Sequence, residues 1–311
     1  MKYAVLGPGG IGGLVAGLLA RAGHEVVVVV REGAGASYPD HIRVESVVYG
    51  TFEAPVRVTE RLVEHVDVLF VACKSTQLPE AVQSASPRDI GTPLVIPLLN
   101  GLEHIALLRS IYGHAAVVPG MIRAESTRVG PGNIIHKGWH VVNLDDGDPL
   151  TPRQPLQLSA DGPRRAEVEE VAVELAAAGL PSQLWDEGQV VWQKLAVLVP
   201  HALATTAVAG PIGLARADPE VLRHMLRGSL EVIEVAARKG ITLNRARVMD
   251  AVERFPDSMR PSMLRDLEAG REPEIANIAD PVIRQGSALG VSVASLEWLR
   301  DRAAAKVAAR R

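Results

Sequence analysis

The sequence predicts an α/β domain built on a parallel sheet, followed by an all-helical domain. Along the first half, short runs rich in Val, Ile and Leu alternate with helical or loop segments, which is typical of parallel strands covered on both faces. From about Asp186 onward, the apolar residues recur at helical spacing. The chain has 311 residues, more than the ~100–200 usual for one domain. We therefore expect two domains, over residues 1–185 and 186–311.

In the first domain, apolar runs predict strands over residues 3–6, 25–30, 66–73, 93–98 and 115–118. Apolar and polar residues alternate more strictly from about residue 129 to 144, which predicts an antiparallel extension. The loop 145–155 is acidic, but Asp145, Asp146 and Asp148 lack the spacing and distal glutamate of a calcium loop, so we interpret them as solvated. One further helix is predicted over residues 167–178.

In the second domain, capping signals delimit the helices. Asp218, Pro219 and Glu220 are an N-cap, a proline at the first helical position and an early acid, and Gly240 ends that helix. Further helices are predicted over residues 245–255, 262–269, 274–289 and 295–308. The active site is expected in the cleft between the two domains.

A glycine-rich turn joins the first strand to the first helix, with the sequence Gly7-Pro8-Gly9-Gly10-Ile11-Gly12. Gly7 permits a tight turn, Gly9 lets the backbone approach a pyrophosphate, and Gly12 allows close packing of helix on strand. The helix N-terminus adds unpaired N–H donors and the positive end of the helix dipole. With a second strand after the helix, the turn predicts a Rossmann-like dinucleotide-binding domain; the alternative is a chance glycine-rich turn.

Arg31 follows the second predicted strand and bears on the choice of cofactor. A carboxylate at this position would accept hydrogen bonds from the ribose hydroxyls of NAD, whereas a guanidinium suits the additional 2′-phosphate of NADP. The sequence therefore favours NADPH. The alternatives are an ordinary solvated arginine, or an Arg31 that pairs with the neighbouring Glu32.

Four polar side chains stand where the apolar pattern does not require them. Lys74 and Asn100 follow two predicted strands, at the sheet edge where α/β proteins bind ligands, although either is also compatible with an ordinary strand end. Lys194 lies in a strongly apolar helix, where it is either a buried proton donor or a side chain that reaches solvent. Glu274, by composition alone, is an acid in the first turn of a helix.

These motifs occur in one order along nearly the whole chain: the glycine turn, Arg31, Lys74 with Gln77, Asn100-Gly101, Trp192-x-Lys194-Leu195, Ser262-Met263-Leu264-x-Asp266 and Glu274-Ile275. In this order and spacing the sequence resembles the ketopantoate reductase family. The resemblance implies a two-domain enzyme that uses NADPH to reduce the 2-oxo group of ketopantoate to pantoate, in the pathway to coenzyme A.

The resemblance also implies roles for individual residues. Lys194 would be the general acid that protonates the developing alkoxide. Lys74 and Asn100 would help to hold cofactor and substrate, and Ser262 would contact the substrate. Glu274 would bind the substrate hydroxyl or the nicotinamide end of the cofactor. An ammonium group suits the chemistry, because hydride transfer to a carbonyl carbon places negative charge on its oxygen.

The sequence also departs from the family pattern. Family members carry asparagines four and eight residues after the lysine, where this chain has Leu198 and Ala202. Pro261 replaces a serine, and Ala276 replaces an acidic residue. Losing a hydrogen-bonding group costs ~1–3 kcal/mol, so a less polar 2-oxo acid or a ketone is the alternative substrate. A non-catalytic NADPH-binding protein is the alternative from another class.

One replacement for the missing asparagines is a histidine. His201 and Thr205 return to the face of Lys194 at 3.6 residues per turn, so His201 is a candidate substrate ligand. Pro200 should kink the helix there, and a histidine exposed at the kink is the alternative.

Other functional classes receive little support. The net charge of −3 and the dispersed basic residues argue against a nucleic acid partner. No apolar run reaches the ~20 residues of a membrane helix, and the single cysteine, Cys73 on a predicted strand, fits a cytoplasmic protein. His136 and His140 lack a third metal ligand, so no metal is expected. We expect a monomer or homodimer that acts on a small molecule.

Overall fold

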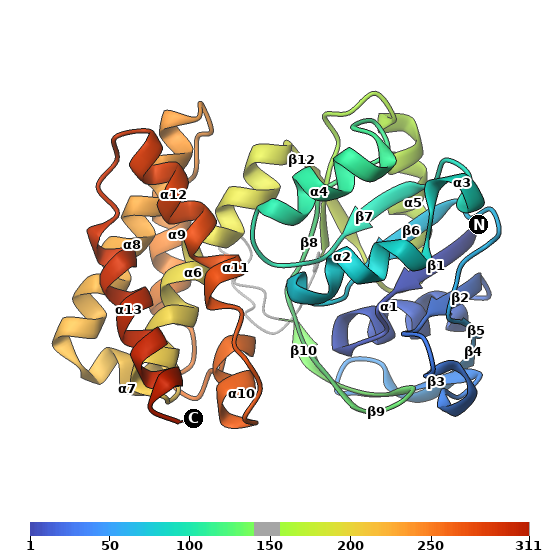
Figure 1. Ribbon diagram of the computed structural model, residues 1–311, viewed down its shortest axis with the longest axis horizontal. Helices are drawn as coiled ribbons and strands as arrows, with labels where there is room; N and C mark the ends of the chain where they lie inside the picture. The colour runs from blue at the N-terminus through green and yellow to red at the C-terminus, as the bar shows by residue number, and fades with distance from the viewer. Residues whose placement is uncertain (140–155, 311) are drawn as a thin grey trace. The chain divides into compact units, whose positions relative to one another are not determined.

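The computed structural model describes residues 1–139 and 156–310 (Figure 1). The chain divides into two compact units, and each is described by itself. The first comprises Met1–Leu99 and His104–Val190, and the second comprises Asn100–Glu103 and Val191–Arg311. The sequence did not predict that the short segment Asn100–Glu103 belongs to the second unit, which is helical and is called the helical unit below. The predicted acidic loop 145–155 and His140 lie outside the described residues.

The first unit is built on a parallel sheet of five strands in the order β5-β2-β1-β6-β7. The strands are β1 (Lys2–Leu6), β2 (Glu25–Val29), β5 (Arg57–Thr59), β6 (Val68–Val71) and β7 (Leu94–Pro97). The chain builds one side of the sheet from β1 through β5 and then crosses to β6. The order therefore reverses between β1 and β6, which is the switch point where such sheets bind ligands.

Two strand predictions need correction. Residues 115–118 form no strand, because they pair with the sheet through a single parallel bridge between Val95 and Val117. The strand predicted over 66–73 ends at Val71, so Cys73 lies beyond it and is partly exposed. Apolar composition alone does not locate the residue at which backbone pairing stops.

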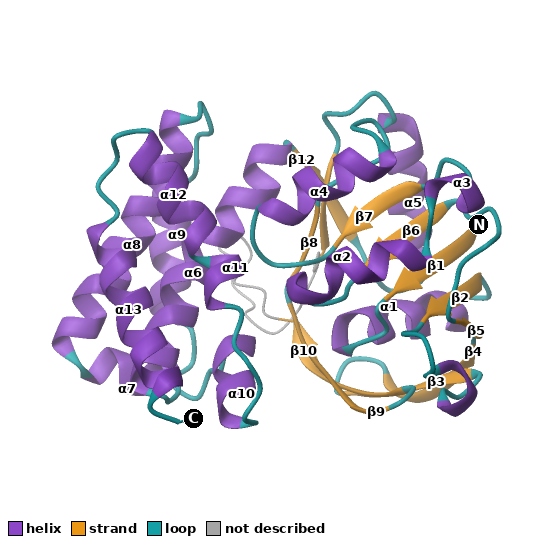
Figure 2. Ribbon diagram, viewed as in Figure 1, coloured by secondary structure: helices purple, strands orange, loops and turns teal. Residues whose placement is uncertain are grey.

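Helix α1 (Gly10–Arg21) packs between the parallel sheet and a second sheet of order β4-β3-β10-β9 (Figure 2). These strands are β3 (His41–Ser46), β4 (Gly50–Pro55), β9 (Ala124–Gly130) and β10 (Asn133–Trp139). The predicted antiparallel extension is confirmed as far as the pairing of β9 with β10. Glycines allow the close approach, since a Cβ on Gly17 would lie 2.9 Å from Val44 Cγ2.

A third sheet of order β12-β11-β8 completes the strands of this unit: β8 (Gly120–Ile122), β11 (Leu156–Ser159) and β12 (Ser182–Trp185). The remaining helices are α2 (Leu78–Ala81), α3 (Pro87–Ile90), α4 (Glu103–Tyr112) and α5 (Arg165–Ala177), with 3₁₀ turns at Gly35–Ser37, Ser75–Gln77 and Val82–Ser84. One face of the parallel sheet, including Val5, Val28 and Phe70, shares a core with α1 and α5. Burial of this apolar surface is the main stabilising contribution.

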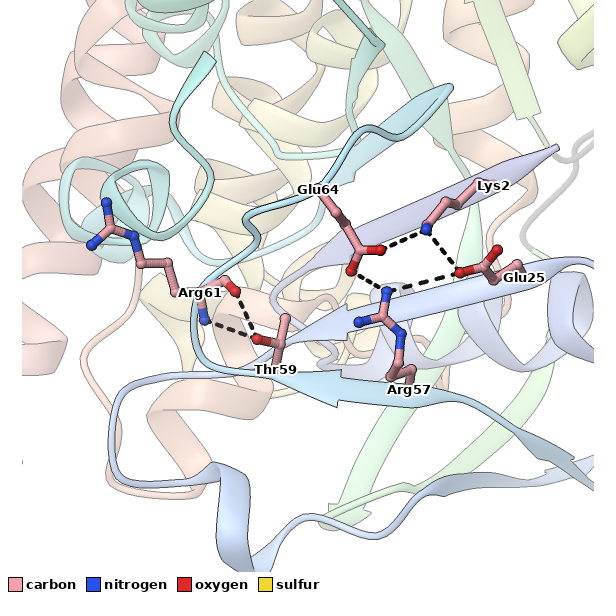
Figure 3. A network of polar contacts seen from close by, with 6 residues as sticks. All are labelled: Lys2, Glu25, Arg57, Thr59, Arg61 and Glu64. Atoms are coloured by element: carbon pink, nitrogen blue, oxygen red, sulfur yellow. Dashed lines mark hydrogen bonds and ion pairs between the residues drawn. The ribbon is translucent and has the colours of Figure 1, made fainter. Parts of the chain in front are cut away.

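A network of ion pairs connects the strands at the amino edge of the parallel sheet (Figure 3). Lys2 Nζ lies 2.9 Å from Glu25 Oε1 and 2.5 Å from Glu64 Oε2, and Arg57 pairs with both glutamates. The Arg57 guanidinium, followed by Lys2, lowers the pKa of Glu64. Lys2, Glu25 and Arg57 begin β1, β2 and β5, and Glu64 precedes β6, so the network lies opposite the carboxyl edge and serves the fold.

The second unit is helical. Its elements are α6 (Glu187–Val208), which begins in the first unit, α7 (Ile212–Ala217), α8 (Pro219–Arg238), α9 (Arg245–Arg254), α10 (Ser262–Glu268), α11 (Ile275–Ile278), α12 (Asp280–Ala288) and α13 (Ala294–Ala308). Asp218 caps α8 by accepting bonds from the amides of Glu220 and Val221, as predicted.

The single helix predicted over residues 274–289 is wrong, because the chain forms α11 and α12 with a break at Ala279. Pro281 favours a break here, because proline lacks the amide hydrogen that would bond to the carbonyl oxygen of Asn277 in a continuous helix, whereas it is tolerated in the first turn of α12. None of the helices described over 1–139 and 156–310 has the length and apolar character needed to cross a membrane.

Candidate active site

The glycine turn requires its glycines. Gly7 has φ +86°, and a Cβ there would lie 2.7 Å from the backbone nitrogen of Cys73. A Cβ on Gly12 would overlap the carbonyl oxygen of Gly7 and lie 3.1 Å from Val5 Cγ1. A Cβ on Gly9, by contrast, would meet nothing within 4 Å. Gly7 and Gly12 thus serve the fold of the turn, whereas Gly9 leaves open space beside the backbone, as a bound pyrophosphate requires.

The N-terminus of α1 fits an anion. Gly9 occupies the N-cap position without a side-chain capping bond, and the first turn carries no acidic residue. The first amides of the helix, from Gly10 and Ile11 onward, therefore meet no carboxylate from the first turn, and the helix dipole favours negative charge at this end. Because the turn follows β1 at the switch point, these donors suit the pyrophosphate of a dinucleotide.

Arg31 is exposed in the turn after β2. Within the part of the chain that the structure describes, no carboxylate, including that of Glu32, forms an ion pair with Arg31. The loop that follows is fixed by Glu60, whose Oε1 accepts a hydrogen bond of 2.6 Å from the amide of Gly35. This bond, with a second from Gly33, lowers the pKa of Glu60. The guanidinium therefore extends from an ordered loop toward solvent.

Lys74 and Asn100 follow β6 and β7, at the carboxyl edge of the parallel sheet. Lys74 immediately precedes the 3₁₀ turn Ser75–Gln77 and belongs to the first unit, called the nucleotide unit from here on because it contains the glycine turn. Asn100 belongs to the helical unit. There, a Cβ on Gly101 would lie 2.6 Å from the carbonyl oxygen of Asn277 on α11. Gly101 thus lets the Asn100 turn pack closely against α11, the helix that Glu274 precedes.

Lys194 lies on α6 and is partly buried, and the nearby residues Trp192 and Leu195 of this helix are buried. The beginning of α6 is fixed in the first unit by two bonds from Arg109 to Glu187, of 2.9 and 2.5 Å. Such a bidentate pair restricts the orientation of both partners. The helix therefore holds Lys194 two turns after a firmly anchored residue.

Ser262 and Glu274 lie at the starts of two short helices. Ser262 is exposed at the first residue of α10, and Glu274 is partly buried at the N-cap position of α11. Between them, Arg271 Nε donates a bond of 2.8 Å to Oδ1 of the buried Asp266. The Arg271 amide also donates to the Asp266 carbonyl oxygen. The pair closes the loop that leads to Glu274. Arg271 was not recognised in the sequence.

His201 is 2% exposed, so the alternative of a histidine exposed at the proline is wrong. Its Nδ1 lies 2.8 Å from the carbonyl oxygen of Val197, and its ring packs edge-on against Phe255 with centroids 4.9 Å apart. Burial lowers the pKa of His201 to about 4. Thr205 is also buried and donates to the carbonyl oxygen of His201. These contacts favour a structural role for His201 over contact with substrate.

The predicted site residues thus fall into two groups. The glycine turn, Arg31 and Lys74 lie in the nucleotide unit, whereas Asn100, Lys194, Ser262 and Glu274 lie in the helical unit. Sequence reasoning missed Ser126 on β9, whose Oγ donates a bond of 2.7 Å to the carbonyl oxygen of Gly10. No local signal marked it, because the contact spans 116 positions. Among the residues described, no cluster of three or more His, Cys, Asp or Glu side chains could hold a metal.

Comparison with known proteins decides the family. Residues 3–149 match the model of ketopantoate reductase PanE/ApbA, and residues 188–306 match that of its C-terminal domain. The chain belongs to the ketopantoate reductase family. It is accordingly an oxidoreductase of the ketopantoate reductase type, and members of this family work with a nicotinamide cofactor.

Three distant relatives match nearly the whole length of the chain. A 2-dehydropantoate 2-reductase of Halobacterium salinarum is 25% identical over 311 residues, which is 97% of both chains. The crystal structure of 2-dehydropantoate 2-reductase from Geobacter metallireducens has a TM-score of 0.83 at 23% identity, covering 98% of this chain and 99% of that one. A D-mandelate dehydrogenase in a ternary structure with NADH and anilino(oxo)acetate has a TM-score of 0.83 at 19% identity, covering 99% of each chain.

Proposed function

We propose that this protein reduces a 2-oxo acid to the corresponding 2-hydroxy acid with NADPH, and that ketopantoate is the first substrate to test. The observation that carries the proposal is the partly buried lysine on α6, Lys194, which stands in the family motif Trp192-x-Lys194-Leu195. A protein that only binds a dinucleotide has no need of a proton donor there.

In the proposed reaction, each predicted site residue has its own role. Bound NADPH supplies the hydride that reaches the carbonyl carbon. The Lys194 ammonium stabilises the negative charge that develops on the carbonyl oxygen and donates the proton that completes the alcohol. Glu274 binds the substrate hydroxyl or the nicotinamide end of the cofactor, and Ser262 and Asn100 contact the substrate. Arg31 binds the 2′-phosphate, and the amides at the start of α1 bind the pyrophosphate.

A second candidate substrate is a 2-oxo acid with an apolar side chain. Leu198, one turn after Lys194, packs against the helical core, and Ala202 is 1% exposed within it, so neither offers a hydrogen bond to a polar substrate. The similar D-mandelate dehydrogenase binds anilino(oxo)acetate, and this supports phenylglyoxylate as a test substrate beside ketopantoate.

The deciding experiment follows the loss of NADPH absorbance with ketopantoate, phenylglyoxylate and a simple ketone. Lys194→Met should lower kcat by roughly 10²–10⁴-fold with little change in NADPH affinity. Lys306→Met, which removes an exposed lysine of α13, is the control and should match the wild type. Tight NADPH binding without turnover of any of these carbonyls would point to a non-catalytic NADPH-binding protein.

A further inference from the structure

Arg123 lies between β8 and β9 and carries a charged side chain. It is partly buried and directly follows the buried Met121 and Ile122. Over residues 1–139 and 156–310, no carboxylate lies within ion-pair distance of its guanidinium. The nearest acid in the sequence, Glu125, pairs with Lys137 at 3.6 Å. Burial lowers the pKa of Arg123 to about 10, so the guanidinium is still charged at neutral pH.

The course of the chain places Arg123 at the carboxyl edge of the parallel sheet. Val117 pairs in parallel with Val95 of β7, and β8 begins three residues later at Gly120. At residue 120 the chain still packs on the end of β7, since a Cβ on Gly120 would lie 3.3 Å from the Pro97 carbonyl oxygen. Arg123 is three residues further along the chain, so it follows a segment that contacts the carboxyl end of β7.

The segment that follows Arg123 contacts the glycine turn. Three residues after it, Ser126 Oγ donates to the carbonyl oxygen of Gly10. An extended chain advances at most ~3.3–3.6 Å per residue. The Arg123 backbone is therefore within about 11 Å of Gly120, which contacts the end of β7, and of Ser126, which contacts the glycine turn. All of these residues belong to the nucleotide unit.

The strand order decides which end of the dinucleotide Arg123 faces. Arg31 follows β2 on one side of β1, whereas β6 and β7 lie on the other side. The segment that leads to Arg123 pairs with β7 at Val117, so it also lies on the β7 side. A dinucleotide with its 2′-phosphate at Arg31 and its pyrophosphate at the turn extends its nicotinamide toward β6 and β7. The substrate carbonyl must lie against the nicotinamide, so it lies on the same side as Arg123.

We propose that Arg123 binds the carboxylate of the 2-oxo acid substrate. The inference rests on the proposed function and names the residue that selects 2-oxo acids over ketones. A guanidinium donates two parallel N–H bonds to a carboxylate, which fixes the orientation of the neighbouring carbonyl group. Partial burial strengthens this interaction, and a ketone without a carboxylate would leave the charge unpaired.

Three variants test the proposal. Arg123→Gln removes the charge, and Arg123→Lys keeps the charge but loses the two parallel N–H donors of the guanidinium. Arg128→Gln, at an exposed position of β9, makes the same charge change away from the proposed site and is the control. The probe is oxamate, an unreactive analogue of a 2-oxo acid, titrated onto each protein saturated with NADPH. Arg123→Gln should weaken oxamate binding about 10- to 100-fold. Arg123→Lys should weaken it less, and Arg128→Gln should leave it unchanged. NADPH affinity without oxamate should stay the same in every variant.

Three results would overturn the inference. Equal oxamate affinity in the wild type and Arg123→Gln would exclude a carboxylate ligand. A parallel loss of NADPH affinity would assign Arg123 to the cofactor pyrophosphate. A lower Tm of Arg123→Gln in the absence of ligands would assign it to the fold. A different result would contradict the proposed function alone: the wild-type protein would bind oxamate through Arg123 but would reduce no 2-oxo acid.

Discussion

Ser126 Oγ on β9 donates a hydrogen bond of 2.7 Å to the carbonyl oxygen of Gly10, the first residue of α1. The contact joins the second sheet to the glycine turn, and it is close enough that a Cβ on Gly10 would overlap the Ser126 carbonyl oxygen. The glycines of the turn therefore divide into those required by the protein's own packing and one, Gly9, with open space around it.

Gly9→Ala and Gly10→Ala should separate these two roles. Gly10→Ala forces the turn away from β9 and should lower the free energy of unfolding by about 1–3 kcal/mol. Gly9→Ala meets no protein atom, so it should leave stability within about 0.5 kcal/mol and instead weaken NADPH binding. Thermal denaturation without cofactor and NADPH titration measure the two effects. Unchanged NADPH affinity in Gly9→Ala would show that the cofactor does not approach this residue.

Arg31→Ala should discriminate between the two nicotinamide cofactors. The loss of a charge-assisted bond to the 2′-phosphate should raise the Kd for NADPH about tenfold or more, while the Kd for NADH changes little. Arg88→Ala, an exposed position on α3, removes the same charge elsewhere and is the control. Equal weakening of both cofactors by Arg31→Ala would mean that Arg31 is not the phosphate ligand.

Leu198→Asn and Ala202→Asn restore the two family asparagines with different structural consequences. Leu198 is partly buried, so its replacement should cost about 1 kcal/mol. Ala202 is 1% exposed in the helical core, where a larger polar side chain should cost about 1–3 kcal/mol or more. Leu198→Asn should also raise kcat/KM for ketopantoate relative to phenylglyoxylate. An unchanged ratio would mean that residue 198 does not contact the substrate.

His201 should make stability depend on pH. Burial, together with the charge of Arg216, lowers its pKa in the folded protein to about 4, whereas an unfolded histidine has a pKa of about 6.5. Between these values the unfolded chain takes up a proton and the folded chain does not. The free energy of unfolding therefore falls as the pH decreases from ~6.5 to ~4, by at most about 1.4 kcal/mol per pH unit.

Chemical denaturation of His201→Gln across this pH range tests the effect. In His201→Gln, the free energy of unfolding should depend less on pH between ~4 and ~6.5 than in the wild type. In His114→Gln, at an exposed position, the pH dependence should match the wild type. A slope that persists unchanged in His201→Gln would mean that His201 is protonated to the same extent in both states.

The sequence by itself determined the features that depend on neighbouring residues. The strand, glycine turn and helix at the N-terminus follow from apolar periodicity and from the positive φ of Gly7. The start of α8 follows from the capping side chain of Asp218. The motif positions of Lys194 and Glu274 were likewise readable, since their spacing along the chain carries the family resemblance.

Only the tertiary structure decided what depends on contacts between distant segments. The pairing of β3 with β10 and the bond between Ser126 and Gly10 join residues about ninety or more positions apart, which periodicity does not encode. For the same reason, the sequence did not show the environments of Arg123 and His201. Whether a polar side chain is buried, and whether a counter-charge lies beside it, is set by elements that pack against it from elsewhere in the chain.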